Sequence, residues 1–97
     1  MWVEIPSSMG LRPLTSAQIR AARALLRWTA DDLARKSALG VNTIRRAELT
    51  ESETALTAAN DLAVRRAFEA AGVEFIDENG GGPGVRLRRR FQPERRK

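Results

Sequence analysis

Cysteine and histidine are both absent from this chain of 97 residues, and only five of its side chains are aromatic. Without cysteine there are no disulfides and no thiolate metal ligands, which suits a reducing compartment, so we expect a cytoplasmic location. Without histidine, the most common general base and metal ligand is missing. The acidic residues fall at expected helix starts and in loops, with no visible acid–base pair. We therefore expect a protein that is not an enzyme and that binds no cofactor or metal.

Long apolar runs are missing as well. No run approaches the roughly 18 apolar residues of a membrane-spanning helix, so we expect no membrane partner. The first nine residues lack the basic and apolar regions of a secretory signal. Hydrophobic residues make up 42% of the chain, but many of them are alanine. One small domain with a thin core is therefore expected, near the lower size limit for independent folding.

The net charge of +5 is unevenly distributed along the chain. Residues 15–50 carry seven Arg or Lys against three acidic residues, and residues 51–85 carry two against seven. Residues 86–97 carry seven against one. Such polarity indicates an anionic partner that binds one chosen surface.

The segment 29–48 has the pattern of two short helices joined by a tight corner. Thr29 is a good N-cap whose hydroxyl can accept the N–H of Asp32, and Asp31 and Asp32 would occupy the first turn, where the helix dipole favours negative charge. Leu33 and Ala34 are expected to face inward. Gly40 is expected to supply backbone angles that other residues resist at the corner.

The second of these helices is expected at residues 41–48. Val41, Ile44 and Ala47 are spaced i, i+3, i+6, so one of its faces is apolar. The residues left projecting are Asn42, Thr43, Arg45 and Arg46. Side chains of these types hydrogen-bond base edges and phosphates.

Two longer helices are expected to flank this pair. One runs over about 16–27 and opens with a capping-box pattern at Thr15–Gln18; its inward face is Ile19, Ala22 and Leu26. The other reads as Ala55–Ala71 and carries two apolar stripes. The first stripe is Leu56, Ala59, Ala63, Ala67 and Ala70, and the second is Val64, Phe68 and Ala71. Two stripes need two partners, so we expect one to face the core and the other a second subunit.

The rest of the chain predicts two strands and two terminal segments. Val73–Ile76 and Val85–Arg88 have strand composition, and they form either a hairpin or strands that pair across a dimer. Residues 1–14 show no period and are expected to form a mobile arm, which is either disordered or touches DNA or a partner through Trp2 or Arg12. The basic tail 89–97 is either a solubilising end or a non-specific phosphate contact.

Together these segments resemble the Cro/repressor-type helix-turn-helix family, also called the XRE family, over roughly residues 15–88. The matching residues are Trp28-Thr29, Leu33-Ala34-Arg35, Val41, Thr43-Ile44-Arg45-Arg46 and Glu48, and the tail formed by 72–76 and 82–87 recurs in small bacterial regulators of this type. The family usually has Gly at the position of Ala38 and a Ser/Thr-like cap at that of Gly40. The segment after the second helix is acidic here, where many relatives approach phosphate.

The resemblance implies a mainly α fold, with a repressor-like domain of four to five helices and a C-terminal β-hairpin or strand pair. It divides the chain into an arm (1–14), a helix-turn-helix domain (15–72), dimerisation strands (73–88) and a basic tail (89–97). It also implies that Arg23 pairs with Glu48 to hold the second helix of the motif against the first helix of the domain. Trp28 is expected to pack on the domain.

The implied function is a sequence-specific, DNA-binding transcriptional regulator that inserts helix 41–48 into the major groove of double-stranded DNA, as a homodimer on a palindromic operator. Base contacts are expected from Asn42, Thr43 and Arg46, and phosphate or close contacts from Thr29, Lys36, Gly40, Val41 and Arg45. The expected dimerisation residues are Val64, Phe68, Ala71, Phe75, Ile76, Val85 and Leu87.

The alternative hypothesis is a protein-interaction module, such as an antitoxin or anti-activator, that retains the same fold. The acidic segment 48–53 favours this alternative, because it would repel phosphate. The pair Arg45-Arg46 opposes it.

Overall fold

The computed structural model describes residues 13–51, 53–77 and 80–88. In chain order its elements are α1 (Ser16–Leu26), α2 (Ala30–Ser37), α3 (Val41–Leu49), α4 (Ala58–Ala70), β1 (Val73–Ile76) and β2 (Gly84–Leu87). The expectation of a mainly helical domain that ends in a strand pair is confirmed. The terminal segments 1–12 and 89–97, with Trp2 and Arg12, lie outside the described residues.

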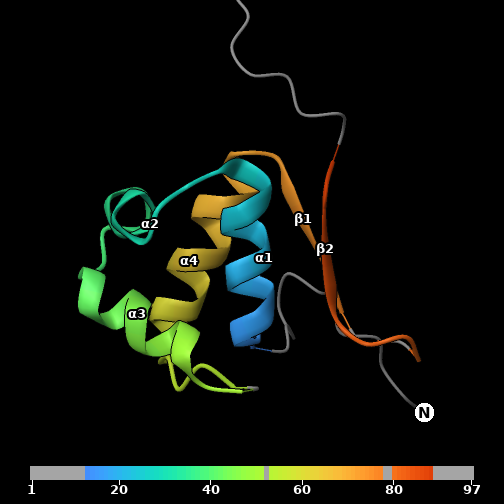
Figure 1. Ribbon diagram of the computed structural model, residues 1–97, viewed down its shortest axis with the longest axis horizontal. Helices are drawn as coiled ribbons and strands as arrows, with labels where there is room; N and C mark the ends of the chain where they lie inside the picture. Colours follow the sequence, from blue (N-terminus) through green and yellow to red (C-terminus); the bar gives the residue numbers. More distant parts are fainter. Residues whose placement is uncertain (1–12, 52, 78–79, 89–97) are drawn as a thin grey trace, which may run out of the picture.

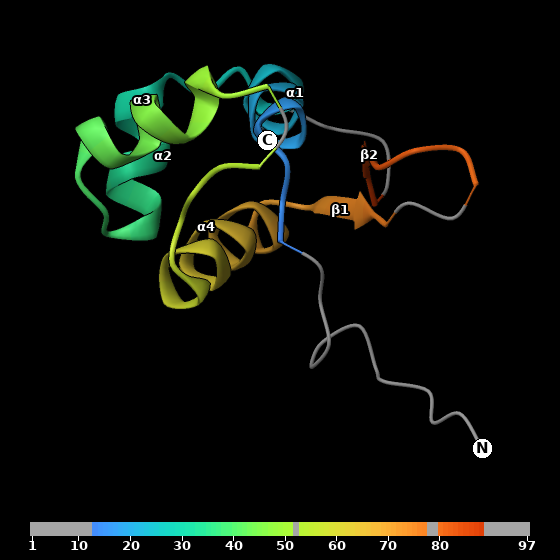
Figure 2. The ribbon, with the colours of Figure 1, turned by 90° about the horizontal axis from the view of Figure 1, so that it is seen from below.

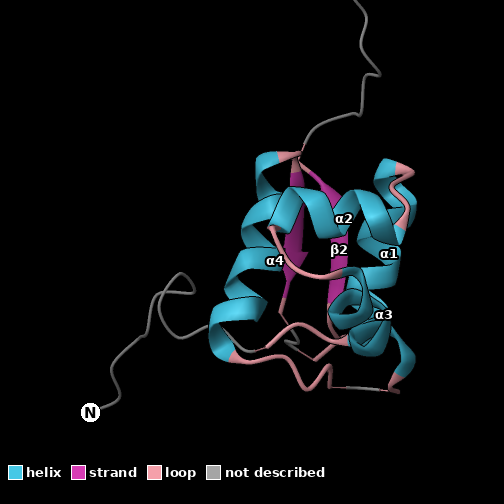
Figure 3. Ribbon diagram, turned by 90° about the vertical axis from the view of Figure 1, so that its left-hand side faces the viewer, coloured by secondary structure: helices cyan, strands magenta, loops and turns pink. Residues whose placement is uncertain are grey.

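The elements form three layers. Helices α1 and α4 make the middle layer, α2 and α3 lie on one side of it, and the hairpin lies on the other (Figure 1, Figure 2). Strand β1 packs on α4 and strand β2 packs on α1, so the small sheet covers the back of the middle layer (Figure 3). Helix α3 is therefore far from the hairpin, at the opposite end of the domain.

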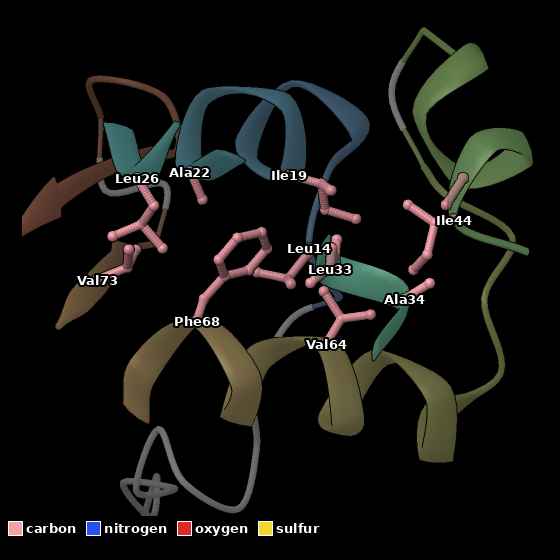
Figure 4. Packing of buried hydrophobic residues seen from close by; sticks show 11 residues of the cluster. Leu14, Ile19, Ala22, Leu26, Leu33, Ala34, Ile44, Val64, Phe68 and Val73 are labelled. Atoms are coloured by element: carbon pink, nitrogen blue, oxygen red, sulfur yellow. The ribbon is translucent and has the colours of Figure 1, made fainter. Parts of the chain in front are cut away.

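The core is organised around Phe68, whose ring points from α4 into the space between the layers (Figure 4). This ring stacks on Trp28 with centroids 5.4 Å apart and meets Phe75 edge-on at 5.8 Å. Aromatic pairs at such distances contribute beyond the area they bury. Three of the few aromatic side chains are thus concentrated where the layers meet, which confirms the expected packing of Trp28. The other fully buried apolar side chains include Leu14, Ile19, Leu33, Ile44, Val64 and Val73.

Both predicted helix starts carry reciprocal caps. The hydroxyl of Thr15 accepts the Gln18 N–H at 3.1 Å, and the Gln18 side chain accepts the Thr15 N–H at 2.9 Å. At α2 the same exchange joins Thr29 and Asp32, at 3.0 and 2.8 Å. These bonds satisfy backbone donors that have no partner inside the helix. The two cap predictions are confirmed.

The corner between α2 and α3 differs from expectation. The left-handed residue is Ala38, with φ 62°, whereas Gly40 has an ordinary φ of −71°. Left-handed geometry is needed directly after α2, where the N–H groups of Ala38 and Leu39 turn back to the carbonyls of Arg35 and Ala34. Gly40 comes too late for that role and instead occupies the N-cap position of α3. The prediction that Gly40 supplies the special backbone angle is wrong.

Helix α4 also differs from expectation. It begins at Ala58 rather than Ala55, because Ala55 is left-handed with φ 64° and Thr57 caps the N–H of Asn60. The stripe of Val64 and Phe68 is the one that faces this chain's own core, with 0% of either residue exposed. Their assignment to a dimer surface is therefore wrong: alanine side chains are too small to fill the space that the Phe68 ring fills. In the other stripe, Ala59 and Ala70 are exposed.

The two strands pair with each other as an antiparallel hairpin, in the register Val73↔Leu87 and Phe75↔Val85. The hairpin alternative is thus confirmed, one residue earlier in the second strand than predicted. The remaining residues predicted at a dimer interface (Ala71, Phe75, Ile76, Val85 and Leu87) are half-buried, and all of them except Ile76 pack against the core. On the other sheet face, Arg86 bonds to Glu74 at 3.0 Å, which lowers the pKa of the Glu74 carboxyl.

Leu14 is part of the core rather than of an arm. Its side chain is 1% exposed, and its N–H donates to Oδ2 of the buried Asp61 at 2.9 Å. The expected arm of residues 1–14 is therefore wrong at its last residue, because Leu14 fills the space between α1 and α4 (Figure 4).

Candidate nucleic-acid interface

Helix α3 presents two different sides. Ile44 and Ala47 are buried and Val41 is half-buried, so these three attach the helix to the core. The opposite side carries Asn42, Arg45 and Arg46, which are exposed, while the half-buried Thr43 lies at the flank. The predicted division of this helix into an inward and a projecting face is confirmed.

The inward side is held by hydrogen bonds from α1. Nε and Nη2 of Arg23 donate to the two carboxylate oxygens of Glu48, each at 2.7 Å, and Nη1 donates to the carbonyl of Trp28 at 2.8 Å. The side-chain hydrogen bond with Glu48 raises the pKa of Arg23. Bidentate pairing of this kind fixes orientation as well as distance. The expected pairing of Arg23 with Glu48 is confirmed.

Two further residues of α1 hold α3, and sequence reasoning missed both. Nη1 of Arg20 donates to the carbonyl of Glu48 at 2.6 Å. The hydroxyl of Ser16 bonds to the carbonyl of Ala47 and to Thr50. These bonds satisfy carbonyls at the end of α3, which lacks a left-handed cap. No sequence signal distinguished Arg20 from a solvated arginine, because its acceptor is a backbone group 28 residues away.

The projecting side is not used by the fold. Within the described residues, the side chains of Asn42, Arg45 and Arg46 make no hydrogen bond or ion pair, so their donors are available to a partner. Gly40 provides no side-chain cap to the start of α3. A Cβ at Gly40 would meet only Thr43 Oγ1, at 4.0 Å. The backbone N–H groups of the first turn are therefore approachable, and they form the positive end of the helix dipole.

Two other predicted contact residues, Thr29 and Lys36, are placed at the ends of α2. Thr29 is exposed, but its hydroxyl already accepts the Asp32 N–H. Lys36 is exposed in the last turn, with Nζ 5.7 Å from the centre of the Trp28 ring. Both side chains are exposed at the surface.

Beyond α3 the surface changes in character. Leu49, the last residue of α3, is 80% exposed, and Glu51 and Glu53 are exposed in the loop that follows. A groove of about 440 Å³ lies between the end of α3, this loop and the start of α4. Its lining residues are Thr43, Arg46, Ala47, Leu49, Thr50, Thr54, Ala55, Leu56, Thr57 and Asn60. Sequence reasoning missed both the groove and the exposure of Leu49, although Leu49 follows Asn42 by two helical turns and so shares its side.

Comparison with models of known protein families and with curated proteins found no match for this chain. In the part of the chain that the structure describes, no helix is long and apolar enough to cross a membrane. The same residues contain no group of three side chains suited to hold a metal ion.

Proposed function

We propose that this protein is a sequence-specific DNA-binding regulator of transcription, with α2 and α3 acting as a helix-turn-helix and α3 as the recognition helix. One observation carries the proposal: α3 is fixed to α1 by the bidentate Arg23–Glu48 pair, while Asn42, Arg45 and Arg46 on its other side are exposed and unused by the fold. Reading bases needs donors that are free but mounted on a rigid element. The resemblance to the XRE family, and the repressor-like fold that it implies, point the same way.

In the proposed complex, α3 lies in the major groove with its N-terminal residues at base edges. Asn42 would bond to an adenine through the oxygen and the nitrogen of its side-chain amide, and Arg46 would donate to a guanine through two N–H groups. The half-buried Thr43 lies at the flank beside Arg46 and would contact a neighbouring base. Arg45 is about 100° around the helix from Arg46, which directs it toward the phosphate backbone.

Phosphate contacts would position the protein without reading sequence. The uncapped start of α3 at Gly40 and Val41 offers backbone N–H groups and the positive end of the helix dipole to a phosphate. Lys36 and Thr29 at the two ends of α2 add side-chain contacts. Fixed backbone donors of this type would set the register in which Asn42 and Arg46 meet their bases.

A second candidate function is a protein-interaction module, such as an antitoxin or anti-activator, that retains this fold. The observation in its favour is the exposed Leu49 beside an acidic loop that carries Glu51 and Glu53. An acidic loop repels phosphate, and an exposed leucine stabilises a complex when the surface of a partner protein buries it. This alternative predicts no binding of duplex DNA at physiological salt.

Selection of bound duplexes from a random pool, followed by titration at several salt concentrations, tests the two functions. We expect enrichment of one sequence class and a steep fall of affinity with salt, with a slope of about 0.9 for each phosphate contacted. Asn42→Ala should lower affinity for the selected duplex more than for a scrambled one. If no duplex sequence is enriched, or if the affinity for duplex does not change with salt concentration, the proposed function is overturned in favour of the alternative.

A further inference from the structure

The charge on helix α1 is gathered on the face that borders the proposed recognition helix. Residues 15–28 contain three arginines (Arg20, Arg23 and Arg27) and no acidic residue. Because these arginines are three, four and seven residues apart, they share one face of the helix. Arg20 and Arg23 both bond to Glu48, so this face lies against α3, which packs on α1 (Figure 3).

Only one of these three charges is matched by an acidic partner within the described residues. The carboxylate of Glu48 accepts Nε and Nη2 of Arg23, each at 2.7 Å. Arg20 donates through Nη1 to the backbone carbonyl of Glu48 at 2.6 Å, which orients its guanidinium without neutralising it. Arg27 is exposed, and its side chain makes no hydrogen bond or ion pair in the same residues. Since a guanidinium has five N–H donors, Arg20 and Arg27 both keep donors for an anion.

Arg45 extends the unmatched charge from α1 onto α3. It comes three residues before Glu48, so the two side chains are neighbours on the flank of α3 that borders α1. Arg45 is exposed and unused by the fold. Arg20, Arg27 and Arg45 thus lie around the Arg23–Glu48 pair, whose own charges cancel. We call these three arginines the α1–α3 patch.

We propose that the α1–α3 patch binds the phosphate backbone of duplex DNA, with Arg20 and Arg27 making α1 a second DNA-contacting element beside α3. This contact depends on the proposed function and adds to it the side of α3 on which one backbone strand runs. A helix inserted in the major groove has a backbone strand on each side of it. Guanidinium groups bind phosphate oxygens through two parallel N–H···O bonds, and these contacts position a protein without reading sequence.

Acidic residues limit where along α1 the backbone can run. Glu53 forms an isolated β-bridge with Thr15, so the acidic loop that follows α3 lies near the start of α1. Arg27 is the C-cap residue at the opposite end of the same helix. Phosphate is repelled at the first end and attracted at the second. We therefore expect the backbone to cross α1 between Arg20 and Arg27, a span of about 10 Å along the helix.

Titrations of the full chain with the selected and the scrambled duplex at several salt concentrations test this contact. Arg20→Gln and Arg27→Gln should each weaken binding to both duplexes by the same factor. Each should lower the salt slope by about 0.9, which corresponds to about fivefold in affinity at physiological salt. Arg66→Gln, which removes the same charge from an exposed position on α4, is the matched control and should change neither quantity.

Arg27→Gly separates a lost contact from a folding defect. Arg27 is left-handed, with φ 58°, a conformation that glycine adopts without the steric penalty of a Cβ. The variant should therefore unfold at a higher temperature than the parent and still bind both duplexes about fivefold more weakly. Binding as tight as that of the parent would overturn the contact.

Two further results would overturn the contact: salt slopes of Arg20→Gln and Arg27→Gln equal to that of the parent, or a loss for Arg66→Gln as large as theirs. If Arg46→Ala weakens binding in the same titrations while both α1 variants bind like the parent, only the α1 contact fails. If the parent enriches no duplex, the proposed function fails, and the α1 contact with it.

Discussion

The two sides of α3 contrast in how far the fold uses them. The inward side is fixed by Ser16, Arg20 and Arg23 from α1, which bond to the last carbonyls of the helix and to Glu48. The outward side carries Asn42 and Arg46, which bond to nothing in the described residues. The residues of α3 that hold the fold are thus different from those of the proposed DNA contact. Substitutions on the two sides should therefore affect different measurements.

The largest expected effect is on the inward side. Arg23→Ala removes three hydrogen bonds and leaves the Glu48 carboxylate, only 10% exposed, without its partner. Breaking a pair buried to this degree should lower the free energy of unfolding by about 3 kcal/mol, as urea denaturation would measure. Arg45→Ala on the outward side is the control and should change that free energy by less than about 0.5 kcal/mol.

A double-mutant cycle with Glu48→Ala makes this prediction stricter. If the pair acts as one unit, the free energy of unfolding of the double variant should fall by clearly less than the sum of the falls in the two single variants. Strict additivity would show that Arg23 stabilises the domain only through its bond to the Trp28 carbonyl.

The next effect belongs to the outward side. Arg46→Ala should weaken binding to the selected duplex by about 1–3 kcal/mol, the range for a bidentate base contact, and leave the unfolding free energy unchanged. Competition titrations with selected and scrambled duplexes measure it. Arg66→Ala, which removes the same charge from an exposed position on α4, is the matched control. Equal losses on both duplexes would make Arg46 a phosphate contact instead.

A smaller effect is expected at the corner that joins α2 to α3. Ala38→Gly should raise the free energy of unfolding by about 1 kcal/mol, because glycine adopts the left-handed conformation without the steric penalty of a Cβ. Ala55 is also left-handed, but lies away from the corner, and Ala55→Gly should raise the free energy of unfolding by a similar amount. A loss of stability at both positions in chemical denaturation would contradict this account.

The smallest effect concerns the cap of α2 in acid. The Thr29 N–H, and secondarily the Thr29 hydroxyl and Arg35, hold the pKa of Asp32 below its ordinary value. The carboxylate therefore contributes stability above the ordinary pKa, and this contribution is lost as the pH falls through the lowered one. Stability curves of the parent and of Asp32→Asn should converge as the pH falls below about 4. A difference in stability between the two proteins that stays constant until the carboxyl groups are fully protonated would rule out this role.

Local signals predicted the parts of this fold that depend on neighbours in sequence. The caps at Thr15 and Thr29 need only residues three apart, and the burial of Ile44 needs only helical spacing. The pairing of Arg23 with Glu48 spans 25 residues and was predicted from the family resemblance rather than from spacing.

Features that depend on three-dimensional packing could not be predicted in the same way. Helix α4 has two apolar stripes, and only the shape of the space around Phe68 decides which one faces inward. The groove beside Leu49 is built from α3, a loop and the start of α4, and no spacing rule joins these segments. The candidate base contacts followed from the spacing around Ile44, but their engagement with DNA stays a prediction.

The guanidinium of Arg23 also bears on how the domain opens. It bonds at once to Glu48 on α3 and to the carbonyl of Trp28 in the turn before α2, so one group of α1 holds both ends of the α2–α3 unit. Local unfolding of either helix would break bonds that the other needs. In amide hydrogen exchange, α2 and α3 should therefore lose protection together, as one cooperative unit rather than as two fraying helices.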